Sequence, residues 1–136
     1  MLQRFGVSLP ADLLERFDAM IEKRGYTNRS EAIRDLIRDS LIEEEWRAGG
    51  EEVLGAAIIV YDHHVPDVAR RLTSIQHDAH PLVVSTMHIH LDHHNCMEIL
   101  ALRGRAASVE ALANKLISAR GVKHGHLFRS TRGAGL

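Results

Sequence analysis

The stretch 87–96 combines two histidines at alternate positions with the only cysteine of the chain. Alternate side chains of a β-strand share a face, so His88 and His90 are expected to point the same way. If the chain turns over residues 92–95, a hairpin brings Cys96 back beside them. Two imidazoles and a thiolate make a borderline-soft metal site that still lacks a ligand. The stretch therefore predicts a protein that uses or measures a transition metal.

The metal site requires the hairpin, because a lone cysteine is more often a small buried apolar residue than a ligand. His77 is the leading candidate for a fourth ligand, although spacing leaves open whether it acts in its own chain or in a neighbour. His124 and His126 also share a strand face, where we favour an ordinary surface role over a weaker second metal site. We interpret four further histidines as exposed or hydrogen-bonded imidazoles: His63, His64, His80 and His94.

The composition is that of an ordinary folded protein. Of the 136 residues, 45% are apolar and 26% are charged, which excludes a disordered chain. No stretch is apolar over the roughly 20 residues that span a bilayer, and the N-terminus does not resemble a signal peptide. A single cysteine cannot form an internal disulfide, so we expect a cytoplasmic protein. The net charge of −1 does not indicate nucleic-acid binding. A prediction that the protein binds DNA must therefore be based on the local arrangement of particular residues.

The Gly49-Gly50 pair and its polar neighbours predict a linker between two domains, residues 1–48 and 53–136. The second domain alternates strand, helix, strand, strand, helix, strand, which predicts an α+β, ferredoxin-like βαββαβ sheet with helices on one face. We expect oligomerisation through its uncovered face. The expected strands are 54–61, 82–91, 96–103 and 122–128, and the expected helices are 67–76 and 108–120, the last capped by Ser108.

The first domain is predicted to be strand, helix, helix. Residues 3–9 alternate as a strand, Pro10 suits the first position of a helix that ends at Gly25, and Asn28 with Glu31 caps the next helix. A lone strand leaves its backbone groups unpaired, whereas a second copy would give an antiparallel two-stranded ribbon over a shared core.

Such a ribbon fits the major groove of double-stranded DNA, and its outward face would carry Arg4, Gly6 and Ser8. The start of the second helix, with Asn28, Arg29 and Ser30, would contact a phosphate. The alternative is a helical hairpin that serves dimerisation only. These DNA-binding candidates are therefore Arg4, Gly6, Ser8, Asn28, Arg29 and Ser30.

Four stretches carry a resemblance to a known family. They are Arg24 to Asp35, Ser74 to His77, His88 to His90 with Cys96 to Glu98, and Arg120 to Leu127. In these the chain resembles the nickel-responsive ribbon-helix-helix repressors of the NikR family, along almost its whole length. The resemblance implies an N-terminal DNA-binding ribbon and an ACT-like C-terminal domain in a homotetramer, a dimer of dimers.

The resemblance also implies one planar Ni(II) per subunit, with ligands His88, His90 and Cys96 of one subunit and His77 of another. Gln76 and Glu98 would hydrogen-bond behind these ligands and orient them. Glu31 and Asp35 match carboxylates that hold a cation near the DNA-binding domain. Gly6 stands where better-known relatives carry a threonine, so the operator sequence is not transferred.

The expected function is a repressor in which Ni(II) bound between subunits promotes operator binding, controlling genes of nickel uptake. Four protein ligands leave no open position for a substrate, which argues against an enzyme. The alternatives are a metal-trafficking or storage protein, an ACT-type regulator of a small organic ligand with a structural metal, and a metallohydrolase with an open zinc site. Sequence-specific DNA binding that requires the metal separates the first function from the others.

Overall fold

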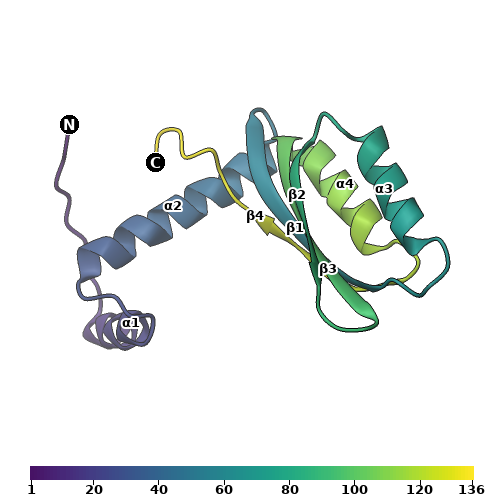
Figure 1. Ribbon diagram of the computed structural model, residues 1–136. Helices are drawn as coiled ribbons and strands as arrows, with labels where there is room; N and C mark the ends of the chain where they lie inside the picture. Colours follow the sequence, from purple (N-terminus) through teal and green to yellow (C-terminus); the bar gives the residue numbers. More distant parts are fainter. The chain divides into compact units, whose positions relative to one another are not determined.

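The computed structural model describes all 136 residues, which form two compact units, residues 1–40 and 41–136. No helix is both long and apolar enough to cross a membrane. The elements are labelled in Figure 1. In chain order they are α1 (Ala11–Lys23), α2 (Arg29–Ala48), β1 (Glu52–Asp62), α3 (Val68–Asp78), β2 (Val83–His90), β3 (Asn95–Arg105), α4 (Ala106–Ile117) and β4 (Val122–Arg129).

The predicted strand over residues 3–9 does not form in the single chain, where residues 1–10 have no regular structure. Its backbone N–H and C=O groups have no second strand to pair with, and an isolated strand is not stable in water. Its apolar side chains stay exposed, Phe5 to 71% and Val7 to 67%. Pro10 was predicted as the first helical residue, but it precedes α1 with extended backbone.

The connection between α1 and α2 follows the sequence prediction. Gly25 ends α1 with a φ of +86°, a conformation that favours glycine, and the N–H of Tyr26 donates to the Ile21 carbonyl. Asn28 caps α2, because its Oδ1 accepts the N–H of Glu31 at 2.9 Å. The Glu31 carboxylate pairs with Arg34 instead of returning to the cap, so only half of the predicted capping box forms.

The second unit is a four-stranded antiparallel sheet in the order β2-β3-β1-β4, with α3 and α4 over one face (Figure 1). This is the predicted ferredoxin-like arrangement, and the α+β fold class is confirmed. Alternate residues of β1 and β3 point toward the helices and form the core. The largest fully buried side chains there include Tyr61, Ile59, Leu72, Leu100, Leu102 and Leu116.

The opposite face of the sheet carries apolar side chains that no element covers. Ile58, Met87 and Phe128 are exposed to 36%, 59% and 63%. His124 and His126 lie on β4, where they pair with Val60 and Ile58 of β1. Neither histidine belongs to the group of three ligand atoms that converges in this chain, and their surface role stays a prediction.

The C-terminal end of α2 belongs to the second unit. The Trp46 ring is buried in its core, and its Nε1 donates to the Ser130 carbonyl at 2.9 Å. Gly55 faces this ring: a Cβ there would lie 3.3 Å from Trp46 and 3.1 Å from Leu127. The boundary between the compact units therefore falls inside α2, before the glycine pair at which the sequence places the division.

The predicted serine cap of the last helix is wrong. α4 begins at Ala106, so Ser108 lies inside its first turn, and the residue at the cap position is Arg105 with no side-chain hydrogen bond. The strand β3 runs directly into α4, which leaves no loop in which a serine could cap the helix.

Candidate metal centre

The hairpin of β2 and β3 forms as the His-x-His spacing predicts. Its register places His90 opposite Cys96 and His88 opposite Glu98. The turn is held by the Asp92 carboxylate, whose Oδ1 accepts the N–H groups of His94 and Asn95 at 2.8 Å each. Hydrogen bonds from the Asn95 side chain, together with these two backbone N–H groups, lower the pKa of Asp92 to about 2, so the turn is held by a carboxylate that is charged at neutral pH.

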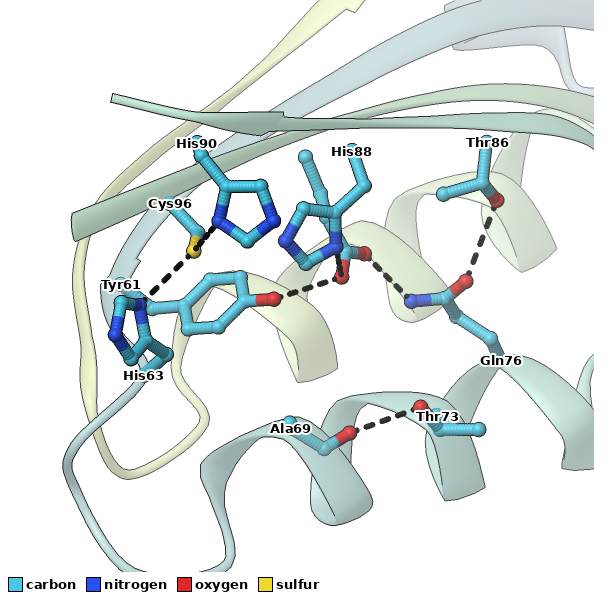
Figure 2. A network of polar contacts seen from close by, with 10 residues as sticks. Tyr61, His63, Ala69, Thr73, Gln76, Thr86, His88, His90 and Cys96 are labelled. Carbon is cyan, nitrogen blue, oxygen red and sulfur yellow. Dashed lines mark hydrogen bonds and ion pairs between the residues drawn. The ribbon is translucent and has the colours of Figure 1, made fainter. Parts of the chain in front are cut away.

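Cys96 is at the centre of a group of three metal-ligating side chains. Its Sγ lies 3.5 Å from Nδ1 of His90 and 3.2 Å from Nδ1 of His63, and Figure 2 shows both rings turned toward the sulfur. Burial, together with the carboxylates of Glu98, Asp92 and Asp62, raises the pKa of the thiol. A cation bound there would have to displace the thiol proton, because the thiolate is the ligand.

His63 is the member of this group that sequence reasoning missed. It follows directly after β1, and the β1–β3 register sets Tyr61 opposite Cys96 and Asp62 opposite Asn95. That pairing carries the His63 ring to the sulfur from a distant part of the chain. The sequence shows only a histidine just beyond the end of a predicted strand. Its position beside Cys96 can be inferred only when the strand that pairs with β1 is known.

His88 belongs to a second, connected set of contacts around Glu98, which is only 7% exposed. Glu98 accepts the Tyr61 hydroxyl at 3.0 Å and the Gln76 side-chain amide at 2.9 Å, and its Oε1 lies 3.5 Å from Nδ1 of His88. The Thr86 hydroxyl donates to the Gln76 carbonyl oxygen at 3.3 Å (Figure 2). Burial and the Glu98 carboxylate raise the pKa of Tyr61, so its hydroxyl remains a donor.

The Glu98 contact can fix the tautomer of His88. A proton on Nδ1 that faces the carboxylate leaves Nε2 with its lone pair free for a metal. The rings of His88 and His90 have centroids 5.1 Å apart, on the same face of β2. Both predicted supporting residues, Gln76 and Glu98, thus lie where they can orient a ligand.

His77 is not part of the converging group in this chain. It is exposed on α3, directly after Gln76, and its nearest aromatic neighbour is His80, with ring centroids 6.4 Å apart. The chain by itself therefore brings together His63, His90 and Cys96, with His88 beside them, whereas the predicted position of His77 is in another subunit.

The predicted DNA-binding residues lie in the first unit. Arg4, Gly6 and Ser8 are exposed on the extended N-terminal segment, and Ser30 is exposed at the start of α2. The Arg29 guanidinium forms two hydrogen bonds of 2.8 Å with the Asp18 carboxylate, although the arginine side chain remains 56% exposed.

Glu31 and Asp35, the carboxylates predicted to share a cation, are each paired inside the chain. Glu31 forms an ion pair with Arg34, whereas Asp35 accepts the Tyr26 hydroxyl at 2.6 Å and pairs with Arg38.

Both parts of the chain match families of known proteins. Residues 54–130 match the NikR C terminal nickel binding domain, and residues 3–44 match the ribbon-helix-helix protein, copG family. A protein of Nitratidesulfovibrio vulgaris strain Miyazaki F is 55% identical over 98% of this chain and 96% of its own length, and one of Pyrococcus furiosus is 52% identical over 96% and 94%. Both carry the provisional name of nickel-responsive regulator.

The chain belongs to the NikR family of nickel-responsive regulators. An uncharacterised protein of Thermotoga maritima matches 58% of the chain with a TM-score of 0.53 at 16% identity, a likeness that concerns the fold alone. Family membership confirms the predicted function class, a nickel-responsive regulator with a DNA-binding ribbon-helix-helix region and a nickel-binding C-terminal region. It also confirms that this NikR-family chain is a regulator and not an enzyme.

Proposed function

We propose that this regulator binds one Ni(II) per subunit with His88, His90 and Cys96 of one subunit and His77 of the partner subunit. The proposal is carried by one observation: the hairpin sets Cys96 beside His90 while the buried Glu98 holds Nδ1 of His88. Three imidazoles and a thiolate are a donor set that suits planar Ni(II) or Cu(II). The imidazole and thiolate groups of these four residues are therefore suitable ligands for Ni(II).

One feature supports a ligand from a second subunit: His77 is exposed and lies outside the converging group, so a neighbouring chain can reach it. A separate feature supports oligomerisation, because the uncovered sheet face, opposite to the side that carries the metal ligands, offers the apolar side chains of Ile58, Met87 and Phe128 to a subunit interface. We infer a homotetramer, a dimer of dimers, in which this face forms the central contact.

The N-terminal unit supports a second, separate dimer contact. Phe5, Val7 and Leu9 remain exposed, and a groove of about 700 Å³ runs between them and the apolar faces of α1 and α2. A second copy of residues 3–9 would pair with the first and close this core. Its outward side chains, Arg4, Gly6 and Ser8, would then enter the major groove of operator DNA.

Phosphate contacts would come from the start of α2. Asn28 holds the first turn in place, which presents the free N–H groups of Arg29 and Ser30. The ion pair with Asp18 fixes the Arg29 guanidinium while leaving more than half of the side chain exposed. A phosphate can therefore approach an arginine that is already ordered.

The coupling between metal and DNA follows from the division of the ligands. Because the four ligands come from two subunits, they converge only in the assembled core. Bound Ni(II) would act as a cross-link that favours one placement of the DNA-binding dimers. The response requires that this placement bind the ion better than the others do, and by linkage operator DNA must then tighten nickel binding equally. We place the protein in the cytoplasm, where its single thiol stays reduced, and infer control of nickel-uptake genes.

A titration of the full-length protein with Ni(II) tests the proposal. The parent should develop thiolate-to-metal charge-transfer absorption that saturates at one ion per subunit, and only the loaded protein should retain specific sequences from a random DNA pool. Cys96→Ala should lose the absorption and the metal-dependent retention, because nickel would lose its only soft ligand. DNA retention independent of nickel, or equal nickel affinity in Cys96→Ala, contradicts the proposal.

A further inference from the structure

We propose that Trp46 is the positioning residue that transmits the nickel state of the second unit to the DNA-binding helix α2. Its ring is held by a set of contacts that we call the Trp46 clamp, formed with Gly55, Arg129 and Ser130. The clamp lies where β1 begins and β4 ends, whereas the proposed nickel ligands lie at the opposite end of the sheet. The inference rests on the proposed function, in which nickel favours one placement of the DNA-binding dimers.

Three contacts hold the Trp46 ring. Its Nε1–H donates to the Ser130 carbonyl at 2.9 Å, and Cζ of Arg129 lies 5.7 Å from the ring centroid. Gly55 lets the ring approach β1, since a Cβ there would lie 3.3 Å from a ring carbon. A guanidinium within about 6 Å of a tryptophan face is attracted to it, and a buried indole N–H needs an acceptor. The pocket therefore satisfies the apolar body and the polar edge of the ring together.

The residues that hold the ring are themselves fixed to the sheet. The N–H of Ser130 donates to the Leu54 carbonyl at 2.9 Å, and Arg129 is the register partner of Gly55 in the β1–β4 ladder. The Arg129 guanidinium also forms an ion pair with Glu110 of α4. Figure 1 shows the segment after β4 returning past the C-terminal end of α2. The clamp is therefore attached to β1, β4 and α4, and the ring moves with the sheet.

The same helix links this anchor to the DNA-binding residues. α2 is one continuous helix of 20 residues, from Arg29 to Ala48, and Asn28 caps its first turn. Ile42 lies one turn before Trp46 and packs against the same core, so the last turns of α2 are fixed along one face. The glycine pair 49–50 comes after the anchor. While the ring is held, that pair cannot act as the joint between the DNA-binding unit and the sheet.

The clamp therefore determines whether a change in the second unit reaches the DNA-binding dimers. With the ring held, a nickel-dependent placement of the sheets also places the end of each α2. With the ring released, the flexible glycine pair becomes the joint, and the dimers sample many placements whether or not nickel is bound. Operator affinity should then rise without nickel and fall with nickel. The nickel ligands and the phosphate contacts stay intact, so each binding reaction alone is preserved while their coupling is lost.

The ratio of operator affinities with and without Ni(II), measured on the full-length protein, tests this role. Trp46→Ala should lower the ratio by at least about fivefold and keep Ni(II) affinity in the absence of DNA within about threefold of the parent, because coupling between two sites is usually about 5–150-fold. Arg129→Gln should change the ratio in the same direction, and Arg129→Lys, which keeps a cation near the ring, should restore it. Arg47→Ala is the matched control, because this neighbouring side chain is exposed, pairs only with Glu44 and lies outside the clamp.

The fluorescence of Trp46, the only tryptophan of the chain, reports on the clamp without nickel or DNA. The parent should show the short-wavelength emission and slow acrylamide quenching of a buried indole. Gly55→Ala should shift the emission to longer wavelength, because the new Cβ comes within 3.3 Å of the ring. If Trp46→Ala is misfolded by circular dichroism, Gly55→Ala and Arg129→Gln provide the same test of the affinity ratio.

Emission typical of a water-exposed indole in the parent would overturn the clamp, whatever the response to nickel. A folded variant with a released ring that keeps the full ratio of operator affinities would overturn the coupling role alone. If the parent binds the operator equally with and without nickel, the proposed function fails, and the coupling role fails with it.

Discussion

Replacing Glu98 with glutamine removes the charge at the centre of the buried network and keeps the shape of the side chain. Oε1 of Glu98 accepts from Tyr61 and faces His88, while Oε2 accepts from Gln76. A glutamine can keep its oxygen toward Tyr61 if Gln76 rotates its amide by half a turn. The Thr86 hydroxyl would then accept a hydrogen bond that it now donates. All contacts survive, but as neutral ones.

The size of the effect follows from that exchange. A hydrogen bond to a charged group contributes about 1.5–3 kcal/mol and a neutral one about 0.5–1.5 kcal/mol. Two exchanged bonds therefore lower the free energy of unfolding by about 1–3 kcal/mol. His88 loses the charged partner that orients its ring, so Ni(II) affinity should fall by about tenfold, or about 1.4 kcal/mol. Glu98→Ala, which leaves two buried donors unpaired, should cost more in both respects.

Urea unfolding of the metal-free protein measures the first quantity, at one fixed protein concentration because the proposed subunit contacts would make stability depend on concentration. Ni(II) titration against a competing chelator measures the second. Tyr61→Phe is the control, since it removes one hydrogen bond and leaves the His88 contact in place. If Glu98→Gln is destabilised as calculated but binds Ni(II) within twofold of the parent, Glu98 supports the fold and does not orient His88.

Three further predictions concern other parts of the chain. Arg4→Ala should weaken binding to operator DNA by about 1–3 kcal/mol per half-site and leave binding to scrambled DNA almost unchanged; equal losses on both would exclude base contacts by the ribbon. Fragment 51–136 lacks Trp46 and should be about 3–5 kcal/mol less stable than fragment 41–136 in denaturant unfolding, and equal stability would place Trp46 outside the core. The carboxyl of Asp92 should titrate near the pKa of about 2 by NMR. Because that pKa is lowered, the carboxylate stabilises the hairpin above about pH 4, and this contribution is lost as the pH falls toward 2; an ordinary pKa would contradict the turn geometry.

The local patterns of the sequence determine much of this protein. Alternation locates the four sheet strands and Asn28 locates the start of α2, because a two-residue period reports which face of a strand is buried and a cap marks where a helix begins. The His-x-His spacing followed by a turn is enough to place His90 beside Cys96, since a hairpin register is set by its turn. Family resemblance then supplies the function class, which rests on residue identities along the whole chain.

Contacts between distant segments were decided only by the tertiary structure. His63 reaches Cys96 because β1 pairs with β3, and Trp46 joins the second core because the end of α2 packs there. Neither contact follows from a regular spacing of residues along the sequence, so a local sequence pattern cannot predict it. The ribbon over residues 3–9 is absent for a related reason: its sequence alternates as a strand should, but the single chain offers no second strand for its backbone groups to pair with.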